Sequence, residues 1–272
     1  MLTWILVSLT LLMAPEGDSR QLAQKGYTAF REVLSGDEAK LPEAIRLLEQ
    51  AKAADETYVP NLYNLARAYF FEGITFNKDE SIRKAEKTFA RLVELDPKRT
   101  DALAFHGAIL ALSSRGQDMQ LFMKGAQELK TASEKTPDDI TVRILQAVVS
   151  QQVPRQALPF IGLNDPVKNV QIVGAVFDSF SSEFAPHASV VMNAFIGETL
   201  MQQGERDKAR ASFETALKLP QPVEEGAIAA RKVLDDAIRL RMGGDGKSIF
   251  EHPAFNGCHS CHLAQPDKLS PR

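Results

Sequence analysis

The chain ends in a short segment whose residue types can bind a metal cofactor. Both cysteines of the 272-residue sequence lie in the stretch Cys258-His259-Ser260-Cys261-His262. Two thiols at this spacing can each add to one vinyl group of the same porphyrin, and the histidine after the second cysteine can bind the iron from below. The spacing therefore predicts one covalently attached haem c, with Cys258 and Cys261 as thioether residues and His262 as the proximal iron ligand.

Other chemistries remain open for the same residues. A disulfide between Cys258 and Cys261 is normal in an oxidising compartment, but it does not need His262. Zinc could use both thiolates with His259 or His262, although the second knuckle that usually completes such a site is not evident. A thioredoxin-like dithiol is disfavoured because the strand-rich βαβ context that it requires is missing from the sequence.

The motif resembles that of c-type cytochromes, but it lies too close to the C-terminus for a complete cytochrome c domain. In an ordinary domain of that family, a methionine ligand follows the motif many residues later. Here the ten residues after His262 contain neither methionine nor histidine. The resemblance therefore carries over Cys258, Cys261 and His262 and nothing further.

A sixth iron ligand, if one is present, must come from upstream or from another chain. His252 is the nearest candidate for the distal ligand, and a solvated tail histidine is the equally weighted alternative. Met242 and His187 would require the chain to fold back, and His259 is poorly directed inside the motif. His106 occupies a helix-packing position and is expected in the core.

The elements that precede this tail are helices arranged in repeats. Apolar helical patterns alternate with turns marked by Pro, Gly and Asp, and no convincing alternating strand is found. Small and large apolar residues recur with a period close to 34 residues, which indicates stacked helical hairpins. The second helices carry the pattern at Ala85, Phe89, Leu92 and Pro97, at Gly125, Leu129, Ala132 and Pro137, and at Ala209, Phe213 and Ala216, with a degenerate opening unit at Ala44, Leu48 and Ala51. The first helices carry it at Leu62, Leu65, Ala66 and Tyr69, at Leu103 and Gly107, and at Ile196, Gly197 and Leu200.

This pattern resembles the tetratricopeptide-repeat (TPR) family over most of residues 20–220. The family implies right-handed stacking of helical hairpins and a concave face that often binds peptides or partner proteins. The expected fold is all-α, a TPR-like helical-hairpin solenoid with a short, mostly irregular C-terminal haem-binding tail. The concave face is expected to be mixed and mostly uncharged, unlike a carboxylate clamp, with Arg67 as a surface residue. Its expected lining is Tyr63, Arg67, Phe70, Ala104, Ala108, Ala111, Glu198 and Met201.

Two stretches depart from the repeat. The unit built on Tyr69 and Ala85 carries about seven extra residues between its helices. Residues 151–185 do not fit at all: Val153 to Asp165 is predicted as a proline-punctuated loop, followed by an atypical helix within the solenoid. A ligand groove formed by this insert is the minority interpretation. The apolar face of the atypical helix consists of Val167, Val170, Val173, Val176, Phe177 and Phe180.

The two ends of the chain are predicted to differ from the solenoid. The apolar run from Leu2 to Ala14 is too short to span a bilayer but fits a signal-peptide core, with a short anchor or a buried first helix as alternatives. Residues 1–19 are thus a leader or anchor, 20–242 the solenoid, and 243–272 a linker with the haem tail. Glycines at 243, 244 and 246 predict a flexible hinge.

Composition and the motifs that are missing from the sequence disfavour several classes of function. Lys plus Arg is 32 and Asp plus Glu is 35, and because no basic stripe stands out, nucleic acid is not an expected partner. Paired carboxylates, a Ser-His-Asp arrangement and a phosphate-binding loop are not found, which disfavours an enzyme. We expect an exported, periplasmic scaffold that binds a protein partner, such as a redox protein, and transfers one electron. It meets a membrane only if the N-terminal segment is retained. The alternatives are a haem-free interaction module with a disulfide or metal-binding tail, or a cytochrome-biogenesis assembly factor.

Overall fold

The structure, a computed structural model, describes residues 16–34, 37–114, 117–179, 186–221, 225–244 and 247–249. Within these ranges the chain is all-α, as predicted, and contains no strand. The α-helices are α1 (Glu16–Leu34), α2 (Leu41–Ala54), α3 (Val59–Thr75), α4 (Asp79–Leu95), α5 (Thr100–Ser113), α6 (Met119–Lys135), α7 (Ile140–Ser150), α8 (Leu158–Ile161), α9 (Pro166–Ser179), α10 (Pro186–Gln202), α11 (Arg206–Lys218) and α12 (Glu225–Gly243).

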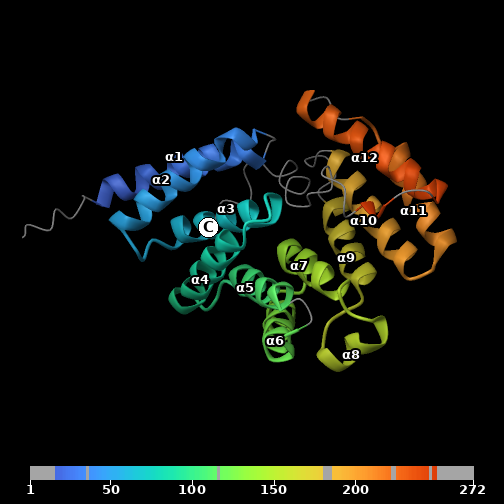
Figure 1. The fold of residues 1–272 in the computed structure, drawn as a ribbon, viewed down its shortest axis with the longest axis horizontal. Helices are drawn as coiled ribbons and strands as arrows, with labels where there is room; N and C mark the ends of the chain where they lie inside the picture. The colour runs from blue at the N-terminus through green and yellow to red at the C-terminus, as the bar shows by residue number, and fades with distance from the viewer. Residues whose placement is uncertain are drawn as a thin grey trace, which may run out of the picture.

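The helices pack as consecutive antiparallel pairs. α1 packs on α2, α3 on α4, α5 on α6 and α10 on α11, while α7 takes α9 as its partner across the short α8. Figure 1 shows the pairs following one another along an arc, with α12 at the far end against α10 and α11. Because each pair is covered by its neighbours, the arrangement is the TPR-like solenoid that the repeat predicts.

Small residues lie where the two helices of a pair cross, as predicted. A Cβ atom added to Gly107 on α5 would lie 2.7 Å from the carbonyl oxygen of Gly125 on α6, and one added to Gly125 would overlap the carbonyl of Gly107. In the last pair, a Cβ on Gly197 would lie 2.5 Å from the ring of Phe213. The backbones can approach this closely only because no side chain intervenes.

The predicted 34-residue period is too short for the first pairs, because α3, α5 and α7 begin at residues 59, 100 and 140. Gly26 meets Leu48 and Gly107 meets Leu129, and each of these contacts spans 22 residues of chain, whereas the contact between Gly197 and Phe213 spans 16. The additional residues are divided between the helices and the connections that join them. In the second pair only three residues, 76–78, join α3 to α4, so the extra segment is helical and not a loop.

The predicted irregular insert is a further hairpin of the solenoid. Val170 and Val173 on α9 are buried, and Arg143 on α7 donates from Nη1 to the Oδ1 of Asn169 at 3.3 Å. The loop expected from Val153 to Asp165, between α7 and α9, contains a 3-10 turn, Arg155–Ala157, and the short helix α8. Its prolines are Pro154, directly before the 3-10 turn, and Pro159 in the first turn of α8, and Pro166 follows the loop as the first residue of α9. Proline is favoured in a first helical turn, so Pro159 and Pro166 start helices.

The core divides into two clusters. The first runs from α1 to α8 and contains the aromatic side chains Tyr63, Phe70, Phe89 and Phe105. The rings of Phe89 and Phe105 are stacked with centroids 4.8 Å apart, and Phe70 meets Phe105 edge-on at 5.5 Å. The second cluster joins α7, α9, α10, α11 and α12 and includes Ile249, beyond the last helix.

At the N-terminal end, α1 begins at Glu16, inside the segment predicted as a leader or anchor. Residues 1–15 lie outside the described residues, so the prediction of export remains untested. Among the described helices, none is both long enough and apolar enough to cross a membrane.

Candidate functional site

The haem-attachment residues predicted from the sequence are Cys258, Cys261 and His262, with His252 as the candidate distal ligand. All four lie outside the described residues, as does His259. The structure instead shows the end of the solenoid from which this tail departs, at residues 247–249. The described residues contain no group of three or more His, Cys, Asp or Glu side chains placed to hold a metal ion.

Ile249 holds the start of the tail on the solenoid. Its side chain is fully buried in the second core cluster, and its backbone N–H donates to Oε2 of Glu198 at 3.3 Å. Its neighbour Ser248 is linked through Oγ to the Nε2 of Gln202, 3.4 Å away. Gly244, with φ of +85°, follows the end of α12 as predicted, and Ser248 and Ile249 lie against α10.

Glu198 on α10 is the buried centre of this arrangement. Its carboxylate accepts from Nε and Nη2 of Arg241 on α12, both at 2.9 Å, and also faces Gln202 and the Ile249 amide. The fork of the guanidinium matches both carboxylate oxygens. A completely buried carboxylate needs such partners, because an unpaired charge in the core is costly. Glu198 therefore joins α10, α12 and the tail.

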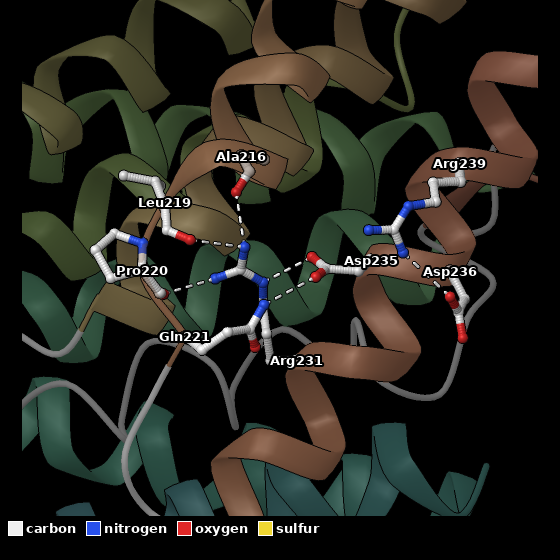
Figure 2. A network of polar contacts seen from close by, with 8 residues as sticks. All are labelled: Ala216, Leu219, Pro220, Gln221, Arg231, Asp235, Asp236 and Arg239. Atoms are coloured by element: carbon white, nitrogen blue, oxygen red, sulfur yellow. Dashed lines mark hydrogen bonds and ion pairs between the residues drawn. The ribbon is translucent and has the colours of Figure 1, made fainter.

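A second buried ion pair fixes the other end of α12. Figure 2 shows Arg231, fully buried, donating to the carbonyl oxygens of Ala216, Leu219 and Pro220 at the end of α11. Its Nε also lies 2.6 Å from Oδ1 of Asp235, one turn further along α12. Carbonyls at a helix C-terminus have no partner within the helix, and Arg231 supplies donors for them. The last helix is thus held at both ends.

A cavity of about 560 Å³ lies beside the ion pair of Glu198 and Arg241, and Arg241 is part of its wall. It is within the size range of small-molecule and cofactor sites. Its wall contains methionine thioethers, which suit soft metals, and arginine guanidinium groups, which suit anions. The lining consists of Met201, Arg206, Asp207, Arg210, Arg241, Met242, Gly243 and Gly244.

Sequence reasoning finds only part of this cavity. Met242 is a candidate iron ligand through folding back, and it lines the cavity while remaining partly buried against the second cluster. The contribution of α11 was missed, although Arg206 and Arg210 are four residues apart and hence share one helix face. That spacing was the available signal, but only the packing of α10 against α12 shows what the face borders.

His106 on α5 does not line this cavity. His106 is buried, as predicted, and its Nδ1 lies 2.6 Å from Oε2 of Glu128 on the next helix, so it is a core residue. The side chain of His187 lies outside the described residues.

The prediction of the concave lining is wrong for seven of its eight residues. Tyr63, Phe70 and the three alanines are buried between neighbouring hairpins, and Glu198 has the role described above. Arg67 is not a surface residue: it is 7% exposed, and its guanidinium lies over the rings of Phe30 and Tyr63 at 5.7 and 5.4 Å. Stacking on aromatic faces allows an arginine to be buried. Met201 alone is partly exposed.

A second cavity, of about 440 Å³, lies between the insert and α10. Its lining is polar and largely neutral and includes Gln151, Gln202 and Thr199. Two oxygens of lining residues, Oγ of Ser150 and Oε1 of Gln203, are buried and have no hydrogen-bond partner among the described residues. The insert therefore forms both a hairpin of the solenoid and one wall of a groove.

Comparisons with known proteins agree with the fold. The tetratricopeptide-repeat family model matches residues 192–221, which hold most of α10 and all of α11. The structure is similar to the crystal structure of a thermophilic TPR protein in Thermus thermophilus, with a TM-score of 0.57 and 15% identity over 84% of this chain and 98% of that one. It also matches a MamA RS-1 ArsTM double mutant, with a TM-score of 0.46 and 14% identity over 76% of this chain and 95% of that one. No curated protein matches the sequence.

Proposed function

We propose that this TPR-like solenoid is an exported scaffold that binds a protein partner and carries one c-type haem on its C-terminal tail for one-electron transfer. TPR domains generally bind protein partners, so the solenoid fold supports the scaffold role. The observation that carries the haem is the sequence Cys258-His259-Ser260-Cys261-His262, which contains the only two cysteines of the chain. Export follows from the same argument, because haem attachment takes place outside the cytoplasm.

The attachment chemistry needs no further reactant. The S–H bond of each cysteine adds across one vinyl C=C bond, so a sulfur–carbon bond forms and the hydrogen goes to the other vinyl carbon. Once bound, the haem supplies an Fe(III)/Fe(II) couple, and a redox protein gives or takes the electron. His262 is the proximal ligand in this proposal. The partner would lie on the concave face, where residues other than the buried set named above must contact it.

The first experiment is a pyridine haemochrome spectrum with a haem-stained denaturing gel, on the full chain expressed with a c-type maturation system. We expect haem that survives denaturation in the wild type and in Ser260→Ala, which keeps the motif intact. The double variant Cys258→Ala/Cys261→Ala should lose it.

A correctly exported wild-type chain without haem would overturn the proposal. The chain would then be a haem-free interaction module with a disulfide or metal-binding tail. Co-purification with an apocytochrome would identify it instead as a cytochrome-biogenesis factor.

A further inference from the structure

We infer that the cavity lined by Met201, Arg206, Arg210 and Met242 is the docking site of the haem tail. In this arrangement the arginines receive the haem propionates and one methionine supplies the sixth iron ligand. The inference rests on the proposed function, because it needs a haem on Cys258 and Cys261. It adds a position for that haem and a ligand that the motif does not contain.

The place where the described chain ends supports this occupant. Ile249 and Arg241 bind the same carboxylate, that of Glu198, and Arg241 is part of the cavity wall. The tail therefore starts at the edge of the cavity. Cys258 follows Ile249 by nine residues, and an extended chain of that length spans up to about 30 Å. The tether is thus long enough to fold back over the cavity.

Charge complementarity supports the same occupant. A haem has two propionates, and the cavity wall contains three arginines against one acidic residue, Asp207. Arg241 is paired with Glu198. Arg206 and Arg210 make no ion pair with any other residue in the described ranges, so their guanidinium groups are available to two carboxylates.

The two methionines provide the ligand type that the tail itself lacks. Methionine is an established axial ligand of c-type haem iron and raises the reduction potential. Met201 on α10 and Met242 on α12 line the same cavity, and both pack partly against the second core cluster. The Arg231 and Glu198 networks fix the two helices that present these side chains. The ligand is therefore held by a rigid frame, as axial ligation requires.

The test compares matched variants of the full, haem-loaded chain. Covalent haem is counted first by the pyridine haemochrome of denatured protein, which does not depend on docking. The native protein is then examined for the long-wavelength charge-transfer band of methionine-ligated Fe(III) and for its reduction potential. The variants are Met201→Leu, Met242→Leu and Arg206→Gln/Arg210→Gln. The controls are Met123→Leu on α6 and Arg239→Gln on the outer face of α12, whose side chains are exposed.

We expect full haem content throughout, loss of the band in one of the two cavity methionine variants, and a lower potential in that variant. The double arginine variant should also have a lower potential, because two positive charges near the iron are lost. The controls should match the wild type. The inference is overturned if haem is present but every variant keeps the wild-type spectrum and potential. It is also overturned by a bis-histidine spectrum that His252→Ala abolishes. Absence of haem in all samples would instead refute the proposed function.

Discussion

The first three hairpins and the C-terminal end of the solenoid are stabilised by different kinds of contact. Helices α1 to α6 pack through large apolar and aromatic side chains, with Phe105 in contact with three other rings. At the other end, α10, α11 and α12 are joined by two buried ion pairs, Glu198 with Arg241 and Arg231 with Asp235. Apolar burial is non-directional, whereas buried ion pairs specify one geometry. The difference indicates that stacking builds the solenoid and that polar networks position its last helix and tail.

The two regions also differ in the length of their hairpins. The pair α10–α11 has the contact spacing of an ordinary TPR, and it is the pair that the family model matches. The first three pairs keep the same kind of crossing with more residues between the crossing positions. A repeat can therefore gain residues in its helices or its connection without losing its fold, because only the crossing point requires small residues.

The largest expected effect is in the aromatic region. Replacing Phe105 with alanine should lower the free energy of unfolding by about 4 kcal/mol, because it removes a ring in contact with Tyr63, Phe70 and Phe89. Guanidinium unfolding followed by circular dichroism measures the loss, and hydrogen exchange should place it in α3 to α6. Phe160→Ala, at a side chain that is 88% exposed, is the control. If hydrogen exchange increased as much in α10 to α12 as in α3 to α6, the division into two regions would be contradicted.

The next effect tests the polar end. Arg231→Met should cost about 3 kcal/mol, because it removes the cation paired with the buried carboxylate of Asp235 and the guanidinium donors to three carbonyls. Hydrogen exchange should increase in α12 and at residues 247–249 while α3 to α6 stay protected. Arg239→Met, at an exposed pair with Asp236, should change little. If both variants behave alike, the buried network does not hold the last helix.

A smaller change in stability distinguishes two glycines at which the helices of a pair approach closely, Gly125 and Gly73. Gly125→Ala should destabilise by roughly 1 to 3 kcal/mol, because the new methyl group meets the backbone of α5. At Gly73, the nearest atom to a new methyl group is the flexible end of Ile82, so Gly73→Ala should be closer to neutral. Chemical denaturation of the two variants under the same conditions gives the comparison. The reverse order would show that helix propensity outweighs the close approach.

The smallest effect is a pH dependence in the first region. Burial alone would raise the pKa of Asp101, but hydrogen bonds and charge from Arg99 bring it below the ordinary value of 3.8. A carboxyl whose pKa is lowered by folding stabilises the protein above its unfolded pKa, and this stability is lost as the pH falls through the folded pKa. Asp101→Asn should therefore reduce the loss of stability below about pH 4. Denaturation midpoints measured from about pH 6 to about pH 3 test this. An unchanged acid dependence would place the sensitivity in other carboxyls.

Much of the fold could be predicted from residue types alone. The small residues at Gly107, Gly125 and Gly197 and the buried aromatic residues lie where the repeat places them, because these positions depend on local helix geometry. The concave lining could not be predicted. Burial of Tyr63 and Arg67 depends on how far each hairpin rotates against the next, which a period does not specify. The extra residues of the second pair were placed between its helices, because a helix accepts additional turns without a sequence signal.

The sequence by itself determined that the chain is a helical repeat and that its tail holds the C-x-x-C-H motif, because both are encoded in residues close together along the chain. Only the tertiary structure decided that Glu198 and Arg241, 43 residues apart, share a buried ion pair that also binds the amide of Ile249. It likewise decided that Met201, Arg206 and Met242 face one cavity. Contacts between distant segments depend on the packing of three helices, and no local pattern specifies that packing.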